Sequence, residues 1–504
     1  MTTILKRFVI VGGGSAGWMT AAALSSVYDP NTVEIVLVES DAIGTVGVGE
    51  ATIPDILKFN AMLGLREDEF MRATDATFKL GIQFVDWGRK GDVYVHPFGE
   101  HGADLNGIDF HHYWLAAHET GDVPAIEEFS LCAVAAKAGK FALPSRDARS
   151  VLSQMGYAYH FDANLYGRFL RRFAEGRGVR RIEGEVREVG RDPSSGFVTE
   201  VRLSDDRAVS GDFFFDCSGF RALLHEGALD VPFIDWSHWL PCDRAQVVPS
   251  AHVGPIKPLT TSTAKTGGWQ WRIPTQRRIG NGHVYCSAFM DDVSAAEVLL
   301  ETVDGPPLSE PRRIAFRTGH RRSFWEKNCV AIGLSAGFIE PLESTSIHLI
   351  QQGISRFIAL MPDTSLPETL RREYNRSMRA DFEEVRDFIV LHYKATERND
   401  SPFWDYCRTM DVPDSLQRKI DLFRESGRAF RHGEELFARP SWVAVFLGQN
   451  ILPSRLHPVA SQVPEQKVRQ SLSSMRRAIT TTADTMPSHE DFLSRYCGWK
   501  PSLQ

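Results

Sequence analysis

The 504-residue sequence has no closely spaced cysteine pair, no long apolar run and no excess of basic residues. Its seven cysteines form no CxxC motif, so neither a disulfide framework nor a zinc site is indicated, and a reducing cytoplasm fits best. No stretch approaches the roughly 20 apolar residues of a membrane span. The formal net charge of -7 disfavours a nucleic-acid partner, because phosphate binding requires a basic face. We therefore expect a cytoplasmic globular protein without a metal site or a membrane segment.

Glycines near the N-terminus follow the spacing Gly12-x-Gly14-x-x-Gly17 between an expected strand (8–11) and an expected helix (16–26). The first glycine permits a tight turn, the second lets a pyrophosphate approach the backbone, and the third allows close helix–strand packing. The basic and apolar residues before them superficially resemble a signal peptide, but glycines interrupt the apolar run. The pattern predicts a dinucleotide site rather than a signal peptide or a glycine-rich turn without a ligand.

FAD is the dinucleotide that the sequence favours over NAD. A second buried strand (33–38) ends at Glu39, whose carboxylate can accept hydrogen bonds from ribose hydroxyls. The glycine fingerprint occurs once, whereas later strands at 212–216 and 329–332 run into small-residue turns that suit further flavin contacts. An NADPH-using flavoenzyme often has a second complete fingerprint, so reducing equivalents are expected to come from elsewhere. The three strand-to-glycine junctions predict one nucleotide domain assembled from separated segments.

The C-terminal third has a helical pattern. It predicts helices at residues 347–360, 366–393, 415–426 and 465–484. Gly427 stands where a glycine commonly ends a helix. We therefore expect a core at residues 1–345 and a mainly helical, substrate-side module at 346–504 packed on it.

Five segments of the chain resemble the flavin-dependent tryptophan/indole halogenase family. They are residues 12–19, GVGEATIP at 47–54, FKLG at 78–81, WxWxIP at 269–274 and EPLEST at 340–345. Many flavoproteins share the glycine fingerprint, whereas WxWxIP together with Lys79 and EPLEST is highly specific. The resemblance implies an α/β fold: an FAD-binding Rossmann-like domain of the glutathione-reductase/flavin-monooxygenase type with an added, mainly helical C-terminal module.

The resemblance also implies two catalytic residues. Lys79 would present the halogen, because a lysine amine can hydrogen-bond hypohalous acid or be halogenated, and a buried lysine shifts its pKa readily. Glu343 would stabilise the cationic ring intermediate and assist loss of the ring proton. Without the resemblance, a surface lysine and a carboxylate at a helix start would be the ordinary interpretations.

The family pattern assigns binding roles to further positions. The implied flavin contacts are Gly12, Gly14, Ser15, Ala16, Gly17, Glu39, Gly49, Ala51, Val186, Leu334 and Ile347. The backbone amides of Thr345 and Ser346 would hold the halide, because a helix N-terminus binds anions. Many members have glycine at 346 and an aromatic residue at 348, where this chain has serine and His348. The choice between bromide and chloride therefore stays open.

The sequence argues against free tryptophan as the substrate. Family members that act on it hold its zwitterion with tyrosines and an acid in a C-terminal helical lid. The corresponding segment, 437–450, contains neither, and Arg439 is its only charged residue. Indole, a substituted indole or a tryptophan within a larger molecule is the expected substrate. The residues expected to line its pocket, each with plain packing as the alternative, are His96, Phe98, His111, Trp269, Trp271 and Trp442.

The implied reaction uses FADH2 from a separate flavin reductase, O2 and a halide to form hypohalous acid, which travels to Lys79. Two other functions remain open at this point. One is an aromatic monooxygenase or oxidase of the same fold, which would not need the lysine. The other is a non-catalytic flavin-binding protein. The sequence leaves the oligomeric state undecided, with a homodimer as one option.

Overall fold

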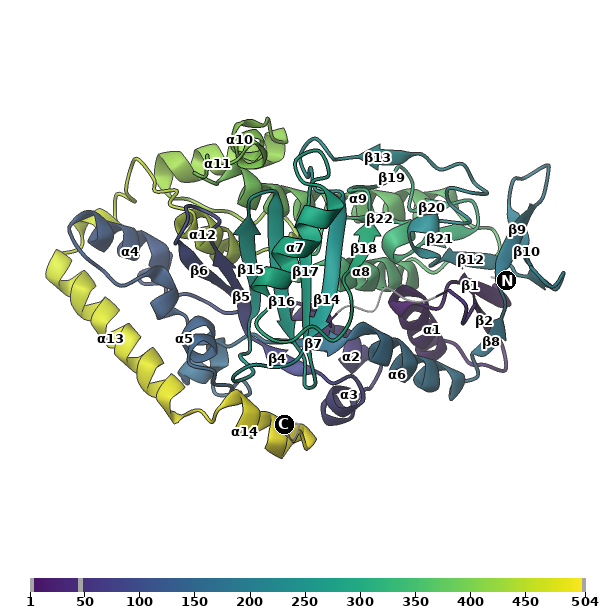
Figure 1. Cartoon of the computed structure of the whole chain (residues 1–504), viewed down its shortest axis with the longest axis horizontal. Helices are drawn as coiled ribbons and strands as arrows, with labels where there is room; N and C mark the ends of the chain where they lie inside the picture. Colours follow the sequence, from purple (N-terminus) through teal and green to yellow (C-terminus); the bar gives the residue numbers. More distant parts are fainter. Residues whose placement is uncertain (1–3, 44–48, 501–504) are drawn as a thin grey trace.

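The computed structural model describes residues 4–43 and 49–500. Figure 1 shows a parallel sheet on the right, a seven-stranded sheet in the centre, and helices α4, α5, α12 and α13 on the left. The architecture is the mixed α/β fold that the sequence predicts. Gly47 and Val48 of the GVGEATIP motif lie outside the described residues.

The parallel sheet contains the predicted nucleotide-domain strands. In spatial order its strands are β20 (Trp325–Glu326), β21 (Cys329–Ala331), β12 (Phe213–Asp216), β1 (Arg7–Val11), β2 (Glu34–Glu39) and β8 (Arg180–Glu183). All neighbours pair in parallel except β20 and β21. Strands β21, β12 and β1 are adjacent although up to about 300 residues separate them. Segments far apart in the sequence therefore build this one sheet, and its assignment as a nucleotide domain stays a prediction.

The seven-stranded sheet forms the centre of the molecule. Its order is β18 (Arg312–Ala315), β14 (Arg244–Ser250), β17 (Ile279–Tyr285), β16 (Gly268–Pro274), β15 (Thr260–Lys265), β5 (Gly81–Val85) and β6 (Val93–Pro97). Strand β15 pairs in parallel with β5, and the other pairs are antiparallel. The β15–β5 pairing places the segment after Lys79 one strand away from the WxWxIP strand β16, in the same sheet.

Three small sheets complete the strand inventory of the described residues. The first contains β11 (Ala208–Ser210), β10 (Val198–Leu203) and β9 (Val186–Arg191). The second contains β13 (Phe233–Asp235), β19 (Gly319–Arg321) and β22 (Gly337–Phe338). The third contains β3 (Gly49–Ala51), β7 (Ala158–Asp162) and β4 (Thr77–Lys79). In the third, Lys79 lies opposite Ala158 of β7.

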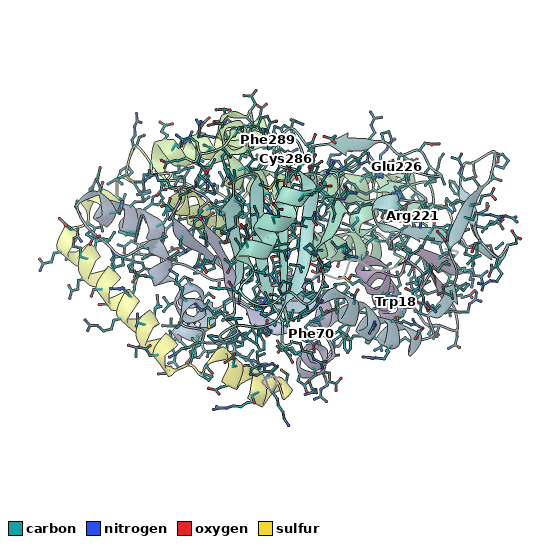
Figure 2. The ribbon with its side chains drawn as sticks, in the orientation of Figure 1. Trp18, Phe70, Arg221, Glu226, Cys286 and Phe289 are labelled. Atoms are coloured by element: carbon teal, nitrogen blue, oxygen red, sulfur yellow. The ribbon has the colours of Figure 1, made fainter. Side chains whose placement is uncertain are left out.

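Helices before residue 303 surround the two large sheets. They are α1 (Ser15–Val27), α2 (Asp55–Met62), α3 (Glu67–Ala73), α4 (Phe110–Glu119), α5 (Leu131–Lys137), α6 (Ala163–Glu175) and α7 (Asp292–Thr302). Helix α1 follows the glycine turn, as predicted. Trp18 of α1 and Phe70 of α3, both labelled in Figure 2, are buried between these helices and the sheets.

The C-terminal part is helical, as predicted. Its helices are α8 (Ser346–Ala359), α9 (Glu368–Lys394), α10 (Pro402–Thr409), α11 (Asp414–Ser426), α12 (Arg439–Gly448), α13 (Glu465–Thr485) and α14 (His489–Cys497). Gly427 ends α11 with a left-handed φ of 66°. The four predicted helices agree with α8, α9, α11 and α13, whereas α10, α12 and α14 were not predicted. The domain boundary at residue 345 stays a prediction.

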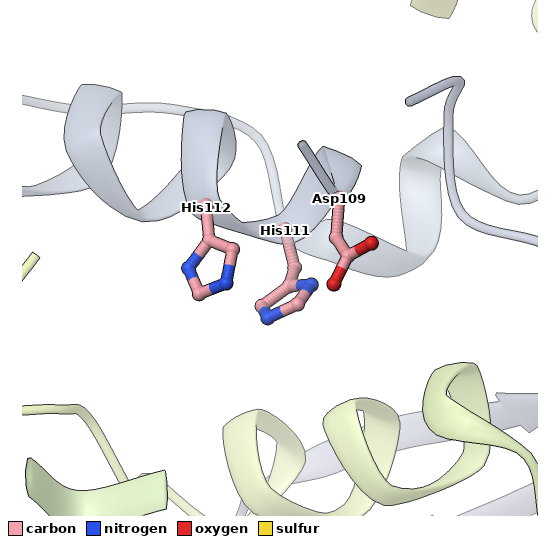
Figure 3. A group of neighbouring side chains, drawn as sticks. All are labelled: Asp109, His111 and His112. Carbon is pink, nitrogen blue, oxygen red and sulfur yellow. The ribbon is translucent and has the colours of Figure 1, made fainter. Parts of the chain in front are cut away.

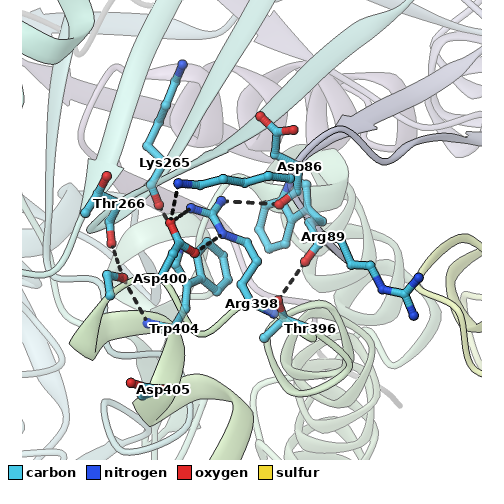
Figure 4. A network of polar contacts seen from close by, with 12 residues as sticks. Asp86, Arg89, Lys265, Thr266, Thr396, Arg398, Asp400, Trp404 and Asp405 are labelled. Atoms are coloured by element: carbon cyan, nitrogen blue, oxygen red, sulfur yellow. Dashed lines mark hydrogen bonds and ion pairs between the residues drawn. The ribbon is translucent and has the colours of Figure 1, made fainter.

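A polar network joins the connection after α9 to the central sheet (Figure 4). The Arg398 guanidinium donates to both Asp400 carboxylate oxygens, at 2.8 and 2.9 Å, and to the Asp86 carbonyl at 3.2 Å. The Trp404 indole N–H donates to the Lys265 carbonyl at 2.7 Å. These bonds fix the helical region against the β5–β6 and β15–β16 connections.

The buried interior contains all seven cysteines as free thiols, including Cys286, which Figure 2 labels. No disulfide bond joins any of the seven, all of which lie within the described residues. Within residues 4–43 and 49–500, no helix is long and apolar enough to cross a membrane.

Candidate active site

Lys79 lies at the end of β4 with no exposed surface. Its Nζ donates a hydrogen bond to the Ser344 hydroxyl at 2.8 Å and lies 5.0 Å from the centre of the Phe98 ring. Burial lowers the pKa of Lys79 to about 7, although the Glu343 carboxylate acts in the opposite direction. A substantial fraction of the amine is therefore neutral near pH 7, which is the form that can react with an electrophile.

The backbone around Lys79 is held from three sides. The Phe78 N–H donates to His489 Nε2 of α14 at 3.2 Å, and the Thr77 hydroxyl donates to the Pro274 carbonyl at 2.7 Å. The Leu80 N–H donates to the Pro258 carbonyl at 2.8 Å. The lysine is thus placed by elements from the middle and the far end of the chain.

Glu343 is buried in the short 3₁₀ turn η5 (Leu342–Ser344), immediately before α8. Its two oxygens face two histidines: Oε2 lies 2.8 Å from His96 Nδ1, and Oε1 lies 2.9 Å from His392 Nε2. Burial alone would raise the pKa of Glu343, but the charges and hydrogen bonds of His96 and His392 outweigh it and hold the pKa well below its usual range. Glu343 is therefore ionised, as a group that stabilises a cation must be.

The conformation of η5 is strained. Glu343 and Ser344 have φ values of 65° and 60°, in the left-handed region that non-glycine residues rarely adopt. Such a residue costs on the order of 1–3 kcal/mol and persists only where the surrounding structure enforces it. Here the strain coincides with the two residues that face His96, His392 and Lys79.

Both ring nitrogens of His392 face an oxygen atom. Its Nδ1 lies 2.8 Å from the Phe388 carbonyl oxygen, and its Nε2 lies 2.9 Å from Glu343 Oε1. The imidazole is therefore held between the backbone of α9 and the buried carboxylate.

The two WxWxIP tryptophans lie two residues apart on β16, on one side of the strand, with ring centres 6.1 Å apart. The Trp269 N–H donates to Glu340 Oε2 at 3.1 Å, and the Tyr393 hydroxyl donates to the same oxygen at 2.5 Å. Burial raises the pKa of Glu340 to about 7, against the lowering effect of these two bonds. The Trp271 ring lies over Gly282, where a Cβ would come within 2.1 Å of it. Both tryptophans are packed side chains.

The glycine turn has the geometry of a dinucleotide cradle. Gly12 has φ 111°, and a Cβ there would lie 2.2 Å from the Cys217 carbonyl oxygen. A Cβ at Gly17 would lie 1.8 Å from the Gly12 carbonyl oxygen, whereas one at Gly14 would meet nothing within 4 Å in the described residues. Ser15 and Ala16 begin α1, whose N-terminus has no side-chain cap. Gly14 and the free helix N–H groups therefore leave an open surface that fits a pyrophosphate.

The other implied flavin contacts are distributed around this turn. Glu39 ends β2, and its carboxylate accepts from Arg181 Nε at 2.5 Å and from Trp18 Nε1 at 3.3 Å. The remaining positions are Gly49 and Ala51 on β3, Val186 on β9, Leu334 in the 3₁₀ turn η4 (Gly333–Ser335), and Ile347 on α8. Leu334 and Ser346 both line a cavity of about 30 Å³ between η4 and α8. The residues present fit FAD, and their individual contacts stay predictions.

The implied halide site lies at the start of α8. Thr345 makes no capping hydrogen bond to this helix, and its buried hydroxyl has no partner among the described residues. The first N–H groups of a helix have no intrahelical acceptor, so the Thr345 and Ser346 amides can bind an anion. His348, also on α8, is buried.

Two of the predicted substrate-pocket residues lie beside the predicted catalytic pair: His96 contacts Glu343, and Phe98 faces Lys79. The Trp442 ring of α12 lies 5.0 Å from that of Phe388, the residue one helical turn before His392. His111 contacts the end of α11, with Nε2 2.8 Å from the Gly427 carbonyl oxygen.

Charged groups in the segment 437–450 are already paired. Arg439 donates to the Asp109 carboxylate at 2.5 Å and to the Asp104 carboxylate at 3.2 Å.

Asp109, His111 and His112 project from the start of α4, with potential ligand atoms within 4.8 Å of one another (Figure 3). Because Asp109 is engaged by Arg439, this group is part of the contact between α4 and α12. The absence of a metal site stays a prediction.

Sequence reasoning missed four polar residues of the site: Ser344, His392, Glu340 and Tyr393. Ser344 and Glu340 belong to the EPLEST run, which was assigned only through Glu343 and Thr345. The sequence carried a signal for His392 and Tyr393, which are polar residues near the buried end of the long amphipathic helix α9. Few polar side chains are needed at such positions, so two in succession point to a specific role. Their partners, however, lie about 50 residues earlier in the sequence.

Comparison with known proteins agrees with this geometry. A family model described as tryptophan halogenase matches residues 7–465. The chain is 36% identical to a tryptophan 6-halogenase of Streptomyces toxytricini, covering 97% of this chain and 98% of that protein. It is 33% identical to a tryptophan 7-halogenase of Lentzea aerocolonigenes, over 99% of this chain and 100% of the relative.

Solved structures give the same result. Xcc4156, a flavin-dependent halogenase from Xanthomonas campestris, superposes with a TM-score of 0.95 at 46% identity, over 99% of this chain and 100% of that one. BrvH, a flavin-dependent halogenase from Brevundimonas sp. BAL3, gives 0.94 at 46% identity, over 98% and 99%. The chain therefore belongs to the tryptophan halogenase family of flavin-dependent halogenases, which are oxidoreductases that use FADH2, O2 and a halide ion.

Proposed function

We propose that this halogenase acts on indole or a substituted indole rather than on free tryptophan, with Lys79 presenting the halogen and Glu343 acting on the ring. The observation that carries the proposal is the buried pair itself: Lys79 is bonded to Ser344, the neighbour of an ionised Glu343. An aromatic monooxygenase would not require this lysine. The enzyme takes an aromatic substrate and depends on a separate flavin reductase, as its family does.

When bound, FADH2 would supply two electrons to O2, the oxidant that converts a halide ion into hypohalous acid, with water as the other product. The neutral Lys79 amine can hydrogen-bond this acid, or take its halogen and release water. The ring carbon then forms a bond to the halogen, and the bond from the halogen to nitrogen or oxygen breaks. Ionised Glu343 stabilises the resulting cation and accepts the ring proton. Burial of both groups limits access of water to the electrophile.

The preference for an uncharged indole is supported by the charges around the pocket. The ammonium and carboxylate of free tryptophan would each require a buried partner. Arg439, the only charged residue of the segment 437–450, is bonded to Asp109 and Asp104. Lys419 lies 4.4 Å above the Trp442 ring and is bonded to Glu435 at 2.7 Å. These charged groups are therefore paired within the protein and are not free to bind the ammonium or carboxylate of an amino acid.

Mass spectrometry of products tests the proposal. Indole and tryptophan are incubated separately with the protein, FAD, a reductase system and either bromide or chloride. We expect halogenated indole in excess of halogenated tryptophan, and loss of at least about 100-fold in rate for Lys79→Met. Lys58→Met, on the exposed face of α2, is the matched control and should retain activity. Faster halogenation of tryptophan would overturn the substrate assignment, and an active Lys79→Met would overturn the mechanism.

A further inference from the structure

His101 is a buried imidazole that the reaction above does not use. Its side chain is 7% exposed, and neither ring nitrogen has a hydrogen-bond partner among the described residues. A neutral imidazole always carries one N–H donor and one acceptor nitrogen. Leaving a buried donor or acceptor unsatisfied costs about 1–3 kcal/mol, so such a residue needs an explanation in a folded protein.

The position of His101 relates it to the catalytic groups. It follows His96, which contacts Glu343, and Phe98, whose ring faces Lys79. The charges of His96 and His111 both act on the His101 ring, so the ring lies near these two histidines. His101 is therefore farther from Glu343 than His96 and closer to the start of α4.

The backbone holds His101 firmly. The N–H of the next residue, Gly102, donates to the Phe129 carbonyl at 2.7 Å. Gly102 has φ 55°, and a Cβ there would lie 2.2 Å from the Phe110 ring. The chain therefore approaches the first residue of α4 so closely that only glycine fits. His101 is presented from a fixed segment and not from a loose loop.

We propose that His101 is a specificity-determining residue that hydrogen-bonds an uncharged polar substituent of the aromatic substrate, such as a hydroxyl or an amide. The inference rests on the proposed halogenation at Lys79 and Glu343, and it narrows the substrate class. A substituent on a ring that reacts at Lys79 would reach His101 if it extends past Phe98 toward α4. Bare indole has no such group to offer.

The surroundings of His101 indicate that the substrate substituent it binds is uncharged. Burial lowers the pKa of His101 to about 3, and the charges of His96 and His111 act in the same direction. The imidazole is therefore neutral near pH 7 and cannot provide a charged partner for a carboxylate. A hydroxyl or an amide can either accept a hydrogen bond from the imidazole N–H or donate one to the other ring nitrogen.

The test compares four substrates: indole, indole-3-ethanol, indole-3-acetamide and indole-3-acetate. Native protein, His101→Phe and His101→Asn are assayed for kcat/KM, and each ligand's binding is measured separately by equilibrium dialysis. For the ethanol and the acetamide, we expect His101→Phe to lower kcat/KM at least 10-fold, mainly through KM. For indole, the change should stay within twofold. His101→Asn keeps a donor and an acceptor and should recover part of the loss. The control is His118→Phe, an exposed position on α4.

Several outcomes would overturn the role of His101. An equal loss for indole and the substituted indoles would indicate packing only, and a larger loss for indole-3-acetate would indicate charge recognition. His101→Met replaces His101→Phe if the latter does not fold. If native protein halogenates none of the four compounds, the proposed function fails. The dialysis ratios between native and variant protein then still decide whether His101 binds the substituent.

Discussion

Lys79 is a buried side chain whose surroundings disfavour its charged form, so its protonation changes the stability of the folded protein. Burial lowers its pKa from the usual 10.5 to about 7. Below pH 7 both folded and unfolded chains bind the proton, and the folded chain bears the desolvation cost, on the order of 5 kcal/mol at 1.36 kcal/mol per pKa unit. Between pH 7 and 10.5 the unfolded chain binds more protons, so the stability of the native protein rises with pH.

The variant Lys79→Met removes the ammonium and should therefore unfold with a higher free energy than native protein at pH 6. Its advantage should shrink by roughly 3 kcal/mol between pH 7 and pH 9. Urea unfolding at pH 6, 7 and 9 measures the difference. Lys58→Met, which loses an exposed lysine, should show no such trend, and a constant advantage for Lys79→Met would contradict the assignment.

His392 contacts the Glu343 carboxylate, and its removal should change the pKa of that carboxyl. We expect His392→Phe to lower kcat about 100-fold while KM changes little, because one carboxylate oxygen loses its partner. The pKa of Glu343 should rise without the imidazole ring, so the acidic limb of the kcat profile should move to higher pH. His392→Asn keeps one donor and should recover part of the rate. An unmoved acidic limb would show that His392 acts only in packing.

At the scale of elements, two glycines between β1 and α1 have different roles: Gly12 is needed for folding, and Gly14 is expected to be needed for FAD binding. A Cβ at Gly14 meets nothing within 4 Å in the described residues, whereas one at Gly12 would strike the Cys217 carbonyl. Gly14→Val should therefore unfold at nearly the native free energy but bind FAD at least 10-fold more weakly, because the side chain occupies the approach of the pyrophosphate.

Thermal unfolding with and without FAD measures both effects for Gly14→Val. Native protein at 100 times the dissociation constant gains about 2.7 kcal/mol from the ligand, and the variant should gain much less at the same concentration. Gly12→Ala is the contrasting variant, since it should be unstable even without FAD. Equal FAD stabilisation of native protein and Gly14→Val would place the pyrophosphate elsewhere.

Elements were predictable where the pattern is local. Strand β2 (Glu34–Glu39) follows from a short buried apolar run, and the end of α11 at Gly427 follows from a helix-stop glycine. The seven-stranded sheet was not predicted, because pairings such as Thr260 with Ile82 join distant segments. Helix α12 was missed because it is buried over most of its surface and shows little periodicity. In the site, Lys79 and Glu343 were found through specific short motifs, whereas His392 is brought to Glu343 only by packing of α9.

At the scale of the whole molecule, the last helix of the chain contacts the strand that contains Lys79. His489 of α14 accepts the Phe78 N–H at 3.2 Å and lies 2.8 Å from the Ile256 carbonyl, although 411 residues separate it from Phe78. His489→Leu should lower the free energy of unfolding by about 1–3 kcal/mol, because it leaves a buried N–H unsatisfied.

The same variant, His489→Leu, should also reduce turnover severalfold at temperatures where it is fully folded, since Lys79 follows Phe78 directly. Urea unfolding and product formation are measured together. His432→Leu, at an exposed position, serves as the control and should change neither. Full activity in a destabilised His489→Leu would show that α14 supports the fold without positioning the lysine.

The seven buried cysteines have a meaning of their own in an enzyme that makes hypohalous acid. Burial raises the pKa of each thiol, which suppresses the thiolate, the form that oxidants attack first. In the folded chain the cysteine sulfur atoms, which are readily oxidised, are therefore buried in the packed interior. Each thiol becomes vulnerable only when its surroundings open during turnover. The oxidation state of the seven sulfurs therefore records the opening of the structure during turnover. Each modified cysteine identifies a region of the molecule that has opened.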